Sequence, residues 1–136
     1  LGLSLLTRAE GDCVSAEAIA KFFASDLFKR VLNAEKVFKE QSFTIAKSVC
    51  DFDPTIPKEF AGETTVVIGR IDLVFIENGE AVIVDYKTDR VHALTELKER
   101  YAQQLDVYGE AVEKAFGYPV KQRILYSLRL RDFIEC

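Results

Sequence analysis

Two apolar runs rich in Val and Ile flank the dipeptide Asn78-Gly79 within the stretch Val66–Asp89. Asn-Gly supplies φ > 0 at both central positions of a type I′ turn, whose twist suits two flanking strands. The pattern therefore predicts a β-hairpin with a two-residue loop, in which Glu77 pairs with Glu80 and the pairing continues outward.

Charged residues gather at the open end of this predicted hairpin. In the predicted register, Asp72 lies opposite Asp85 and Arg70 lies opposite Lys87, all on one face. Facing Cβ atoms are about 4.5–5.5 Å apart, and like charges there weaken a sheet. A divalent cation bridging the two carboxylates would offset that repulsion. The alternative is a salt-bridged sheet edge, in which Arg70 and Lys87 neutralise the aspartates.

Near the turn the hairpin is apolar on both faces, as expected for a central, covered pair of strands. The charged face continues with Val74, Ile76, Ala81 and Ile83, whereas the other face carries Ile71, Leu73, Phe75, Val82, Val84 and Tyr86. Charged groups at the mouth of so apolar a hairpin indicate a functional site.

The remaining chain predicts helices and strands around the hairpin. Helices are expected over 15–23, 25–32 and 94–116, strands over 34–49, 120–130 and 131–136, and a loop over 50–63. In the second helix, the predicted buried side is Leu27, Phe28, Val31 and Leu32; in the third it is Leu97, Tyr101, Leu105, Tyr108, Val112 and Phe116. The long helix favours a parallel return, so the predicted fold class is α/β with a mixed sheet and a central hairpin. The segment 1–14 has no clear period and is expected to be an irregular end.

Composition limits the classes of protein. The 136 residues suit one domain, the net charge of −4 gives no basic nucleic-acid-binding signature, and no segment is suited to spanning a membrane. A cleft that handles phosphates through metal ions remains compatible with this charge. Three widely spaced cysteines form no disulfide or metal pattern, which fits the reducing cytosol. The start of the chain has no signal-peptide pattern. Since the chain has no Met, we expect an excised piece of a longer protein, the alternative being a processed terminus.

Three motifs occur in order: Gly69-Arg70-Ile71-Asp72, Asp85-Tyr86-Lys87-Thr88, and Gln104-Leu105 followed by Tyr108. Together they resemble the RecB-like branch of the PD-(D/E)xK nucleases, and within it the C-terminal nuclease domain of AddA-type helicase–nuclease subunits. The resemblance covers roughly residues 18–130 and implies a restriction-endonuclease-like fold. It also implies an Mg²⁺-dependent DNA nuclease, with Mn²⁺ as a substitute, that processes double-strand DNA ends for recombinational repair.

The resemblance assigns roles residue by residue. Asp72, Asp85 and the backbone carbonyl of Tyr86 would be metal ligands, and Lys87 would assist the attacking water. Glu40 would be an acidic position beside the site, whereas its position in a strand by itself indicates a solvated side chain. Support for the site and the DNA strand would come from Gln104, Tyr108 and Arg70, although the spacing of Gln104 and Tyr108 alone suits a surface amide beside a core tyrosine.

One departure from the family pattern matters. A metal-binding His usually lies on a helix before the first strand, but here the only His is His92, beyond the hairpin. We therefore expect that helix upstream of Leu1, and weak or no activity without it. A four-cysteine iron–sulfur signature is absent, which favours the AddA side over its AddB-type partner.

The partners implied by the resemblance are DNA and a second, AddB-type helicase–nuclease subunit. No Walker motif occurs, so an ATP-driven motor would lie elsewhere. The competing hypothesis is a non-catalytic domain of the same fold that docks a partner protein or holds DNA.

Overall fold

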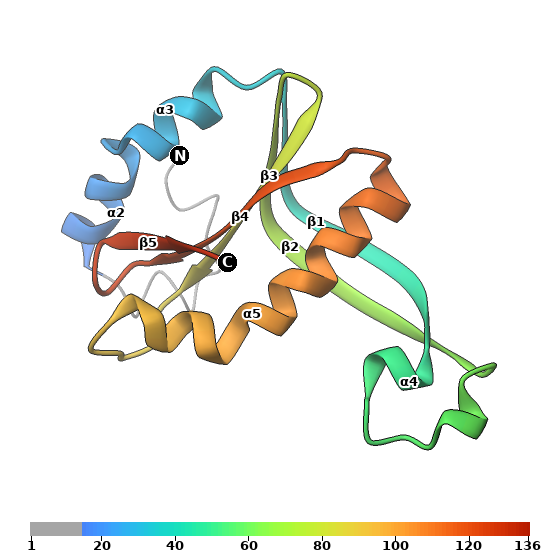
Figure 1. Cartoon of the computed structure of the whole chain (residues 1–136). Helices are drawn as coiled ribbons and strands as arrows, with labels where there is room; N and C mark the ends of the chain where they lie inside the picture. Colours follow the sequence, from blue (N-terminus) through green and yellow to red (C-terminus); the bar gives the residue numbers. More distant parts are fainter. Residues whose placement is uncertain (1–14) are drawn as a thin grey trace.

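The computed structural model describes residues 15–136, so the predicted irregular start over 1–14, including Cys13, lies outside the described part. Its elements in chain order are α2 (Ala16–Phe23), α3 (Asp26–Leu32), β1 (Lys36–Ser48), α4 (Val49–Phe52), η2 (Lys58–Phe60), β2 (Thr64–Glu77), β3 (Glu80–Lys87), α5 (Leu94–Ala111), η3 (Val112–Phe116), β4 (Val120–Ser127) and β5 (Asp132–Glu135) (Figure 1). Each predicted helix and strand is present, but residues 128–130, predicted as strand, form the turn between β4 and β5. The predicted loop over 50–63 contains η2 and most of α4.

The five strands form one mixed sheet in the order β1-β2-β3-β4-β5. Strands β3 and β4 pair in parallel, while the other three neighbouring pairs of the sheet are antiparallel. A parallel pair needs a crossover connection, and α5 supplies it. The predicted α/β class and central hairpin are therefore confirmed.

The hairpin turn has the predicted chemistry. Asn78 and Gly79 have φ of 52° and 76°, as a type I′ turn requires. Ladder pairs run from Glu77↔Glu80 to Leu73↔Val84 in the predicted register. The turn dipeptide thus sets how the two central strands are aligned.

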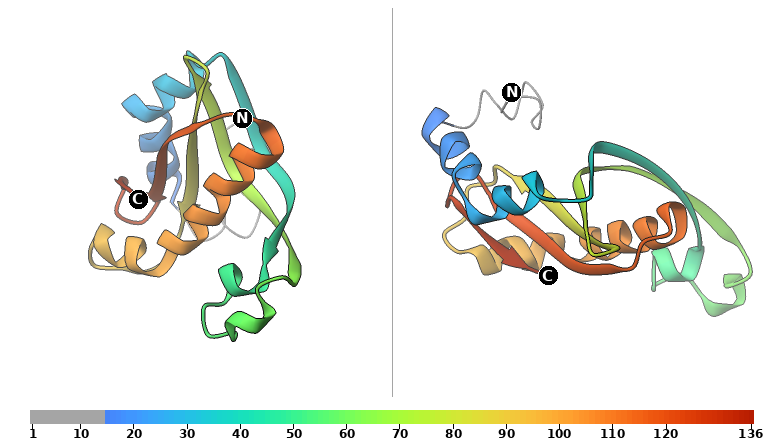
Figure 2. Two further views of the ribbon diagram at one scale, coloured as in Figure 1. Left: turned by 45° about the vertical axis from the view of Figure 1, so that its right-hand side comes forward. Right: turned by 90° about the horizontal axis from the view of Figure 1, so that it is seen from above.

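The helices cover opposite faces of the sheet, with α5 on one side and α2 and α3 on the other (Figure 2). Each face has its own apolar cluster. The α5 face includes Phe43, Ile71, Val74, Ile76, Ile83, Leu97, Leu105, Tyr108 and Leu125, and the α2–α3 face includes Phe22, Leu27, Leu73, Phe75, Val82, Val84, Tyr86, Ile124 and Tyr126. Both faces of the hairpin are therefore buried near its turn, as predicted.

The face of the sheet predicted for Ile71 is wrong. Ile71 packs in the α5 cluster, not beside Leu73 and Phe75 on the opposite face. The alternation along β2 changes phase at Asp72, opposite Glu40 of β1, whose φ is +49°. A positive φ is uncommon for a residue with a Cβ and turns the chain locally, which strict alternation does not anticipate.

Helix ends follow recognisable signals. The Ser15 and Ser25 hydroxyl oxygens accept hydrogen bonds from Ala18 N and Phe28 N, both at 3.2 Å, and so cap α2 and α3. The predicted long helix continues from α5 through the π-helical turn η3 to Gly117, which has a left-handed φ of 76°. Leu32, predicted to be buried, is 70% exposed at the last position of α3.

Beyond the core, β1 and β2 extend together as an arm that ends in α4 and η2 (Figure 1). On this arm Val66 and Ile68 are exposed, while Phe43 and Ile45 on the facing strand are buried towards α5.

Candidate active site

The two predicted metal-binding aspartates lie where β2 and β3 stop pairing. The last ladder pair is Leu73↔Val84, and Asp72 and Asp85 are the next residues outward. Instead of a further ladder bond, the Tyr86 backbone N–H donates to Asp72 Oδ2 at 2.9 Å. The Asp72 side chain thus reaches β3 at Tyr86, the neighbour of Asp85. The predicted ladder pairs Asp72–Asp85 and Arg70–Lys87 do not form, because β2 and β3 stop pairing after Leu73↔Val84.

Lys87 is held close to the carboxylates. Its Nζ lies 2.8 Å from Asp85 Oδ2 and donates a 2.9 Å hydrogen bond to Gln104 Oε1 on α5. Because Lys87 and Asp85 are two residues apart on β3, their side chains share a face. The structure therefore brings Asp72, Asp85, Lys87 and Gln104 together.

The Asp85 carboxylate is suited to a cation. Its side chain is only 4% exposed, and Oδ2 is buried without a well-directed hydrogen bond, despite its short distance to Lys87 Nζ. We regard the contact as a real ion pair, since charge attraction does not need hydrogen-bond angles. A buried carboxylate oxygen lacking a directed donor is a fitting ligand for Mg²⁺, which commonly binds one or two carboxylates and keeps several waters.

Glu40 does not complete a three-carboxylate cluster. It lies between Lys39↔Leu73 and Gln41↔Ile71 in the β1–β2 register, so it is level with Asp72, but its side chain is exposed. Among residues 15–136, no three His, Cys, Asp or Glu side chains form a group that could hold a metal ion. The structure thus offers two carboxylates, with Glu40 at the edge of the site.

Tyr108 lies inward against the sheet, as predicted, and is 8% exposed. Its ring meets Phe43 edge-on, with centroids 5.7 Å apart. Burial raises the pKa of Tyr108, and the charges of Asp85 and Asp72 raise it further, while Arg70 acts in the opposite direction. The phenol therefore stays protonated and senses both carboxylates, whereas the Arg70 side chain is exposed.

Two residues near Lys87 were missed by sequence reasoning. Tyr101 places its ring 3.9 Å from Lys87 Nζ, and its hydroxyl donates to Asp89 Oδ2 at 2.6 Å. The sequence predicts Tyr101 only as part of the buried helical stripe, because an aromatic residue at that spacing usually signals packing. The second Asp of Asp85-Tyr86-Lys87-Thr88-Asp89, two residues after Lys87, was the one sequence feature that could have pointed to this cluster.

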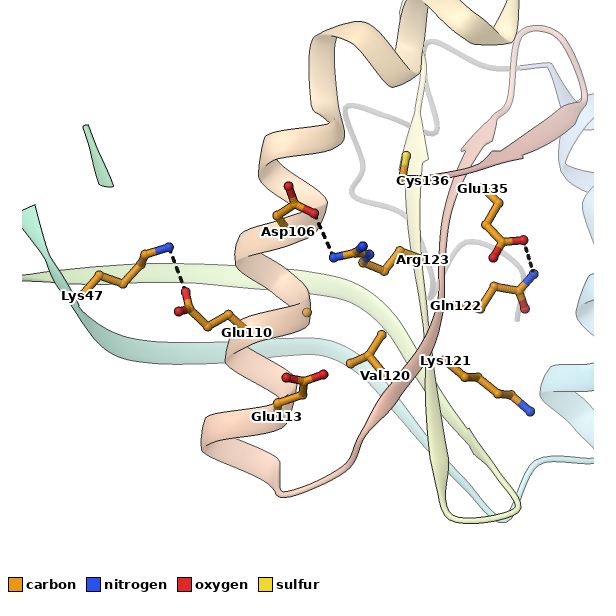
Figure 3. A pocket seen from close by; sticks show the side chains of 11 residues that line it. Lys47, Asp106, Glu110, Glu113, Val120, Lys121, Gln122, Arg123, Glu135 and Cys136 are labelled. Atoms are coloured by element: carbon orange, nitrogen blue, oxygen red, sulfur yellow. Dashed lines mark hydrogen bonds and ion pairs between the residues drawn. The ribbon is translucent and has the colours of Figure 1, made fainter. Parts of the chain in front are cut away.

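One hollow, of about 440 Å³, lies between α5, β4 and the end of β1, and neither Asp72 nor Asp85 lines it (Figure 3). Two ion pairs lie within its lining, Lys47 with Glu110 at 2.9 Å and Arg123 with Asp106 at 2.8 Å, whereas Lys121 pairs with Glu77 outside it. A second, open groove of about 600 Å³ includes Gln104, Arg100 and Lys47 and adjoins Lys87 through Gln104. Of these two hollows, only the second includes a residue, Gln104, that contacts Lys87.

No helix in residues 15–136 is both long and apolar enough to cross a membrane. Cys50 and Cys136 are free thiols.

Comparison with known proteins identifies the family. The profile of the PD-(D/E)XK nuclease superfamily matches residues 7–133. The AddA chain of the ATP-dependent helicase/nuclease of Clostridium acetobutylicum is 35% identical over 96% of this chain, and that of Clostridium kluyveri is 35% identical over 95%. These matches cover 11% and 10% of the two relatives, so the chain spans about a tenth of their length.

The mixed sheet with helices on both faces is consistent with the restriction-endonuclease-like fold of this superfamily. The three motifs of the sequence fall on β2, β3 and α5, the elements that bring Asp72, Asp85 and Gln104 together. Together, the match to residues 7–133 and the shared architecture show that this chain belongs to the PD-(D/E)XK nuclease superfamily.

Proposed function

We propose that Asp72, Asp85 and Lys87 form the active site of an Mg²⁺-dependent deoxyribonuclease. The observation that carries the proposal is the buried Asp85 Oδ2, which has an adjacent cation but no directed hydrogen bond. Asp72 and Asp85 would hold the ion, together with the backbone carbonyl of Tyr86. Because the N–H and C=O of one strand residue point to the same neighbouring strand, the Tyr86 N–H bonded to Asp72 supports that third ligand.

A divalent cation bound there would polarise the phosphate and lower the pKa of a water molecule. The protein's own groups do the rest. Lys87 would hold the attacking water or add positive charge beside the phosphate, and Gln104 Oε1 keeps the ammonium on that side of α5. Tyr108 supports the same face by filling the space between α5 and Phe43. Glu40 would act from the rim, on a strand position level with Asp72.

The proposed substrate is the end of a DNA duplex, processed for recombinational repair, with the whole protein also containing an ATP-driven motor. This follows the names of the relatives, which are ATP-dependent helicase/nuclease chains. The groove lined by Arg100, Lys47 and Gln104, with Asp51 and Asp106, offers cationic and amide groups to a DNA strand. Arg70 is exposed on β2. A cytoplasmic location and an AddB-type partner belong to the same proposal.

The test combines binding and cleavage. Titration calorimetry with Mg²⁺ and Mn²⁺ should detect binding to the unsubstituted full-length protein, called the parent below, at millimolar concentration or below. Asp85→Asn should abolish this binding. Cleavage of an end-labelled duplex should be lost in the same variant. Asp26→Asn is the matched control, because Asp26 is 98% exposed and pairs with Lys29 within α3, on the face of the sheet opposite α5.

Absence of binding and of cleavage in the full-length protein would instead support the competing hypothesis. In that case the Asp85–Lys87 ion pair would stabilise the sheet edge of a non-catalytic domain that docks a partner or holds DNA. Equal loss in Asp85→Asn and Asp26→Asn would likewise contradict a specific role for Asp85.

A further inference from the structure

The end of β3 and the first half of α5 are joined by a cluster centred on Asp89. The Tyr101 hydroxyl donates to Asp89 Oδ2 at 2.6 Å, and Arg100 Nη1 lies 3.1 Å from the same oxygen. The hydrogen bond to Asp89, reinforced by burial, raises the pKa of Tyr101 to about 12. The hydroxyl therefore remains a donor at neutral pH, and the tyrosine ring is fixed at one end.

The other end of this cluster is the Lys87 ammonium. Lys87 Nζ lies 3.9 Å from the centre of the Tyr101 ring, well within the distance of about 6 Å for a cation–π interaction. The same nitrogen is 2.8 Å from Asp85 Oδ2 and 2.9 Å from Gln104 Oε1. Three different groups thus confine one flexible lysine, whose side chain is only 15% exposed.

The three contacts of the Lys87 ammonium differ in kind. Asp85 attracts it towards the carboxylates, and Gln104 accepts one of its protons in a hydrogen bond. The Tyr101 ring, in contrast, covers one side of the ammonium without accepting a conventional hydrogen bond. The N–H groups of Lys87 that do not bond to Gln104 or Asp85 therefore stay available as donors. A lysine side chain is long and flexible, so such a cover restricts where the ammonium can go without neutralising it.

We propose that Tyr101, anchored by Asp89, is a positioning residue that holds Lys87 for catalysis. This inference rests on the proposed nuclease function, since it needs Lys87 to act on the water or the phosphate. Tyr101 acts through Lys87 and does not touch the DNA. Asp89 in turn acts through Tyr101, which gives a role to the last residue of the Asp85–Asp89 stretch.

Two substitutions separate the ring from the hydroxyl. Tyr101→Leu removes the aromatic face, whereas Tyr101→Phe keeps it and loses only the hydrogen bond to Asp89. Tyr118→Leu is the matched control, because Tyr118 is a partly buried tyrosine that lies near Phe38 with centroids 6.5 Å apart, outside the Lys87 cluster.

The first measurement is cleavage of an end-labelled duplex with Mg²⁺. Tyr101→Leu should lower kcat by about tenfold, the scale of a lost cation–π contact, and leave KM for DNA unchanged. Tyr101→Phe should retain most of kcat, and Tyr118→Leu should match the parent. A merely structural role for Tyr101 predicts instead that kcat falls equally in Tyr101→Phe and Tyr101→Leu, or that KM changes with kcat.

The second measurement does not depend on cleavage. Trace acylation with an amine reagent, followed by mass spectrometry, reports how accessible the Lys87 amine is in each variant. Its labelling rate should rise in Tyr101→Leu, stay near the parental value in Tyr101→Phe, and be unaffected in Tyr118→Leu. Unchanged Lys87 labelling in a folded Tyr101→Leu protein overturns the inference.

Failure of the positioning role and failure of the proposed function give different results. If Lys87→Ala abolishes cleavage but Tyr101→Leu cleaves at the parental rate, the positioning role is overturned and the proposed function stands. If Lys87→Ala cleaves at the parental rate, the proposed role of Lys87 is wrong and the positioning role falls with it.

Discussion

The Asp72 carboxylate accepts a hydrogen bond from the Tyr86 backbone N–H, with 2.9 Å between Oδ2 and the nitrogen. This bond stands where a strand-to-strand backbone bond would otherwise continue the β2–β3 ladder beyond Leu73↔Val84. A side chain thereby closes the end of the hairpin, and it brings negative charge next to Asp85. One carboxylate serves both the fold and the site.

Substitutions at Asp72 should separate these two roles. Asp72→Asn keeps an oxygen that can accept from Tyr86 N–H but removes the charge, so stability should be retained while Mg²⁺ binding is lost. Asp72→Ala should lose binding and also about 1–3 kcal/mol of unfolding free energy, because it leaves a backbone donor unpaired. Denaturant unfolding in metal-free buffer, paired with titration calorimetry, measures both effects. Equal destabilisation by the two substitutions would show that the hydrogen bond from Tyr86 N–H does not account for the contribution of Asp72 to stability.

A close approach at Gly69 should make that position sensitive to any side chain. Gly69 pairs with Phe43 across the β1–β2 ladder, and a Cβ on Gly69 would lie 2.6 Å from Phe43 Cζ. Gly69→Ala should push the Phe43 ring towards Tyr108 and cost about 1–3 kcal/mol, as overpacking commonly does. Gly62→Ala is the control, since nothing lies within 4 Å of a Cβ there. Similar unfolding midpoints for the two variants would contradict this account.

Acid stability should depend on the ion pair between Arg30 and Glu77. Arg30 Nη2 lies 2.7 Å from Glu77 Oε1, joining α3 to the hairpin. The hydrogen bond from Arg30, together with Lys121 and against the effect of burial, lowers the pKa of Glu77 from 4.5 to about 2. A lowered folded-state pKa stabilises the protein above pH 4.5, and this contribution is lost as the pH falls from 4.5 towards about 2.

Glu77→Gln should therefore destabilise the protein at neutral pH and flatten its loss of stability between pH 4.5 and about 2. Unfolding free energies measured at intervals across that window provide the test. Glu113→Gln serves as the control, because Glu113 is exposed on the last turn before Gly117. A steep acid slope that persists unchanged in Glu77→Gln would argue against the pair as its source.

The parts of the fold that could be predicted are those with local causes. Asn78-Gly79 determines a turn through backbone conformation alone, so the register from Glu77↔Glu80 to Leu73↔Val84 followed from two residues. Serine caps and the Gly117 stop likewise depend on a few neighbouring atoms. Asp85 and Lys87 could be placed on one face because alternation on a regular strand is geometric.

The wrong or missing predictions concern features that depend on neighbouring strands and helices or on where a helix ends. Ile71 changed faces because the chain turns at Glu40 on the neighbouring strand, and no residue of β2 signals that turn. Leu32 is exposed because α3 ends there, although its spacing fits the buried stripe. The contact between Tyr101 and Lys87 needs α5 docked on β3, and an aromatic stripe alone cannot distinguish packing from contact with an ammonium.

The final prediction contrasts Lys87 with Asp85 in the site itself. Lys87→Ala should remove most cleavage, by about 10²–10⁴-fold, because a positioned catalytic group is lost. Its Mg²⁺ affinity should be largely retained, since Asp72 and Asp85 supply the ligands. Asp85→Ala should lose both affinity and cleavage, because it removes a ligand.

Stability in metal-free buffer adds an independent signature. Lys87→Ala leaves Asp85, whose side chain is 4% exposed, without its ion-pair partner, so the free energy of unfolding should fall by about 3 kcal/mol. Added Mg²⁺ should recover part of that loss, because binding to the folded state alone stabilises by mass action. Asp85→Ala should show no such recovery. Parental cleavage by Lys87→Ala, with metal-dependent recovery intact, would mean that Lys87 serves the aspartates as a structural counter-ion and takes no part in hydrolysis.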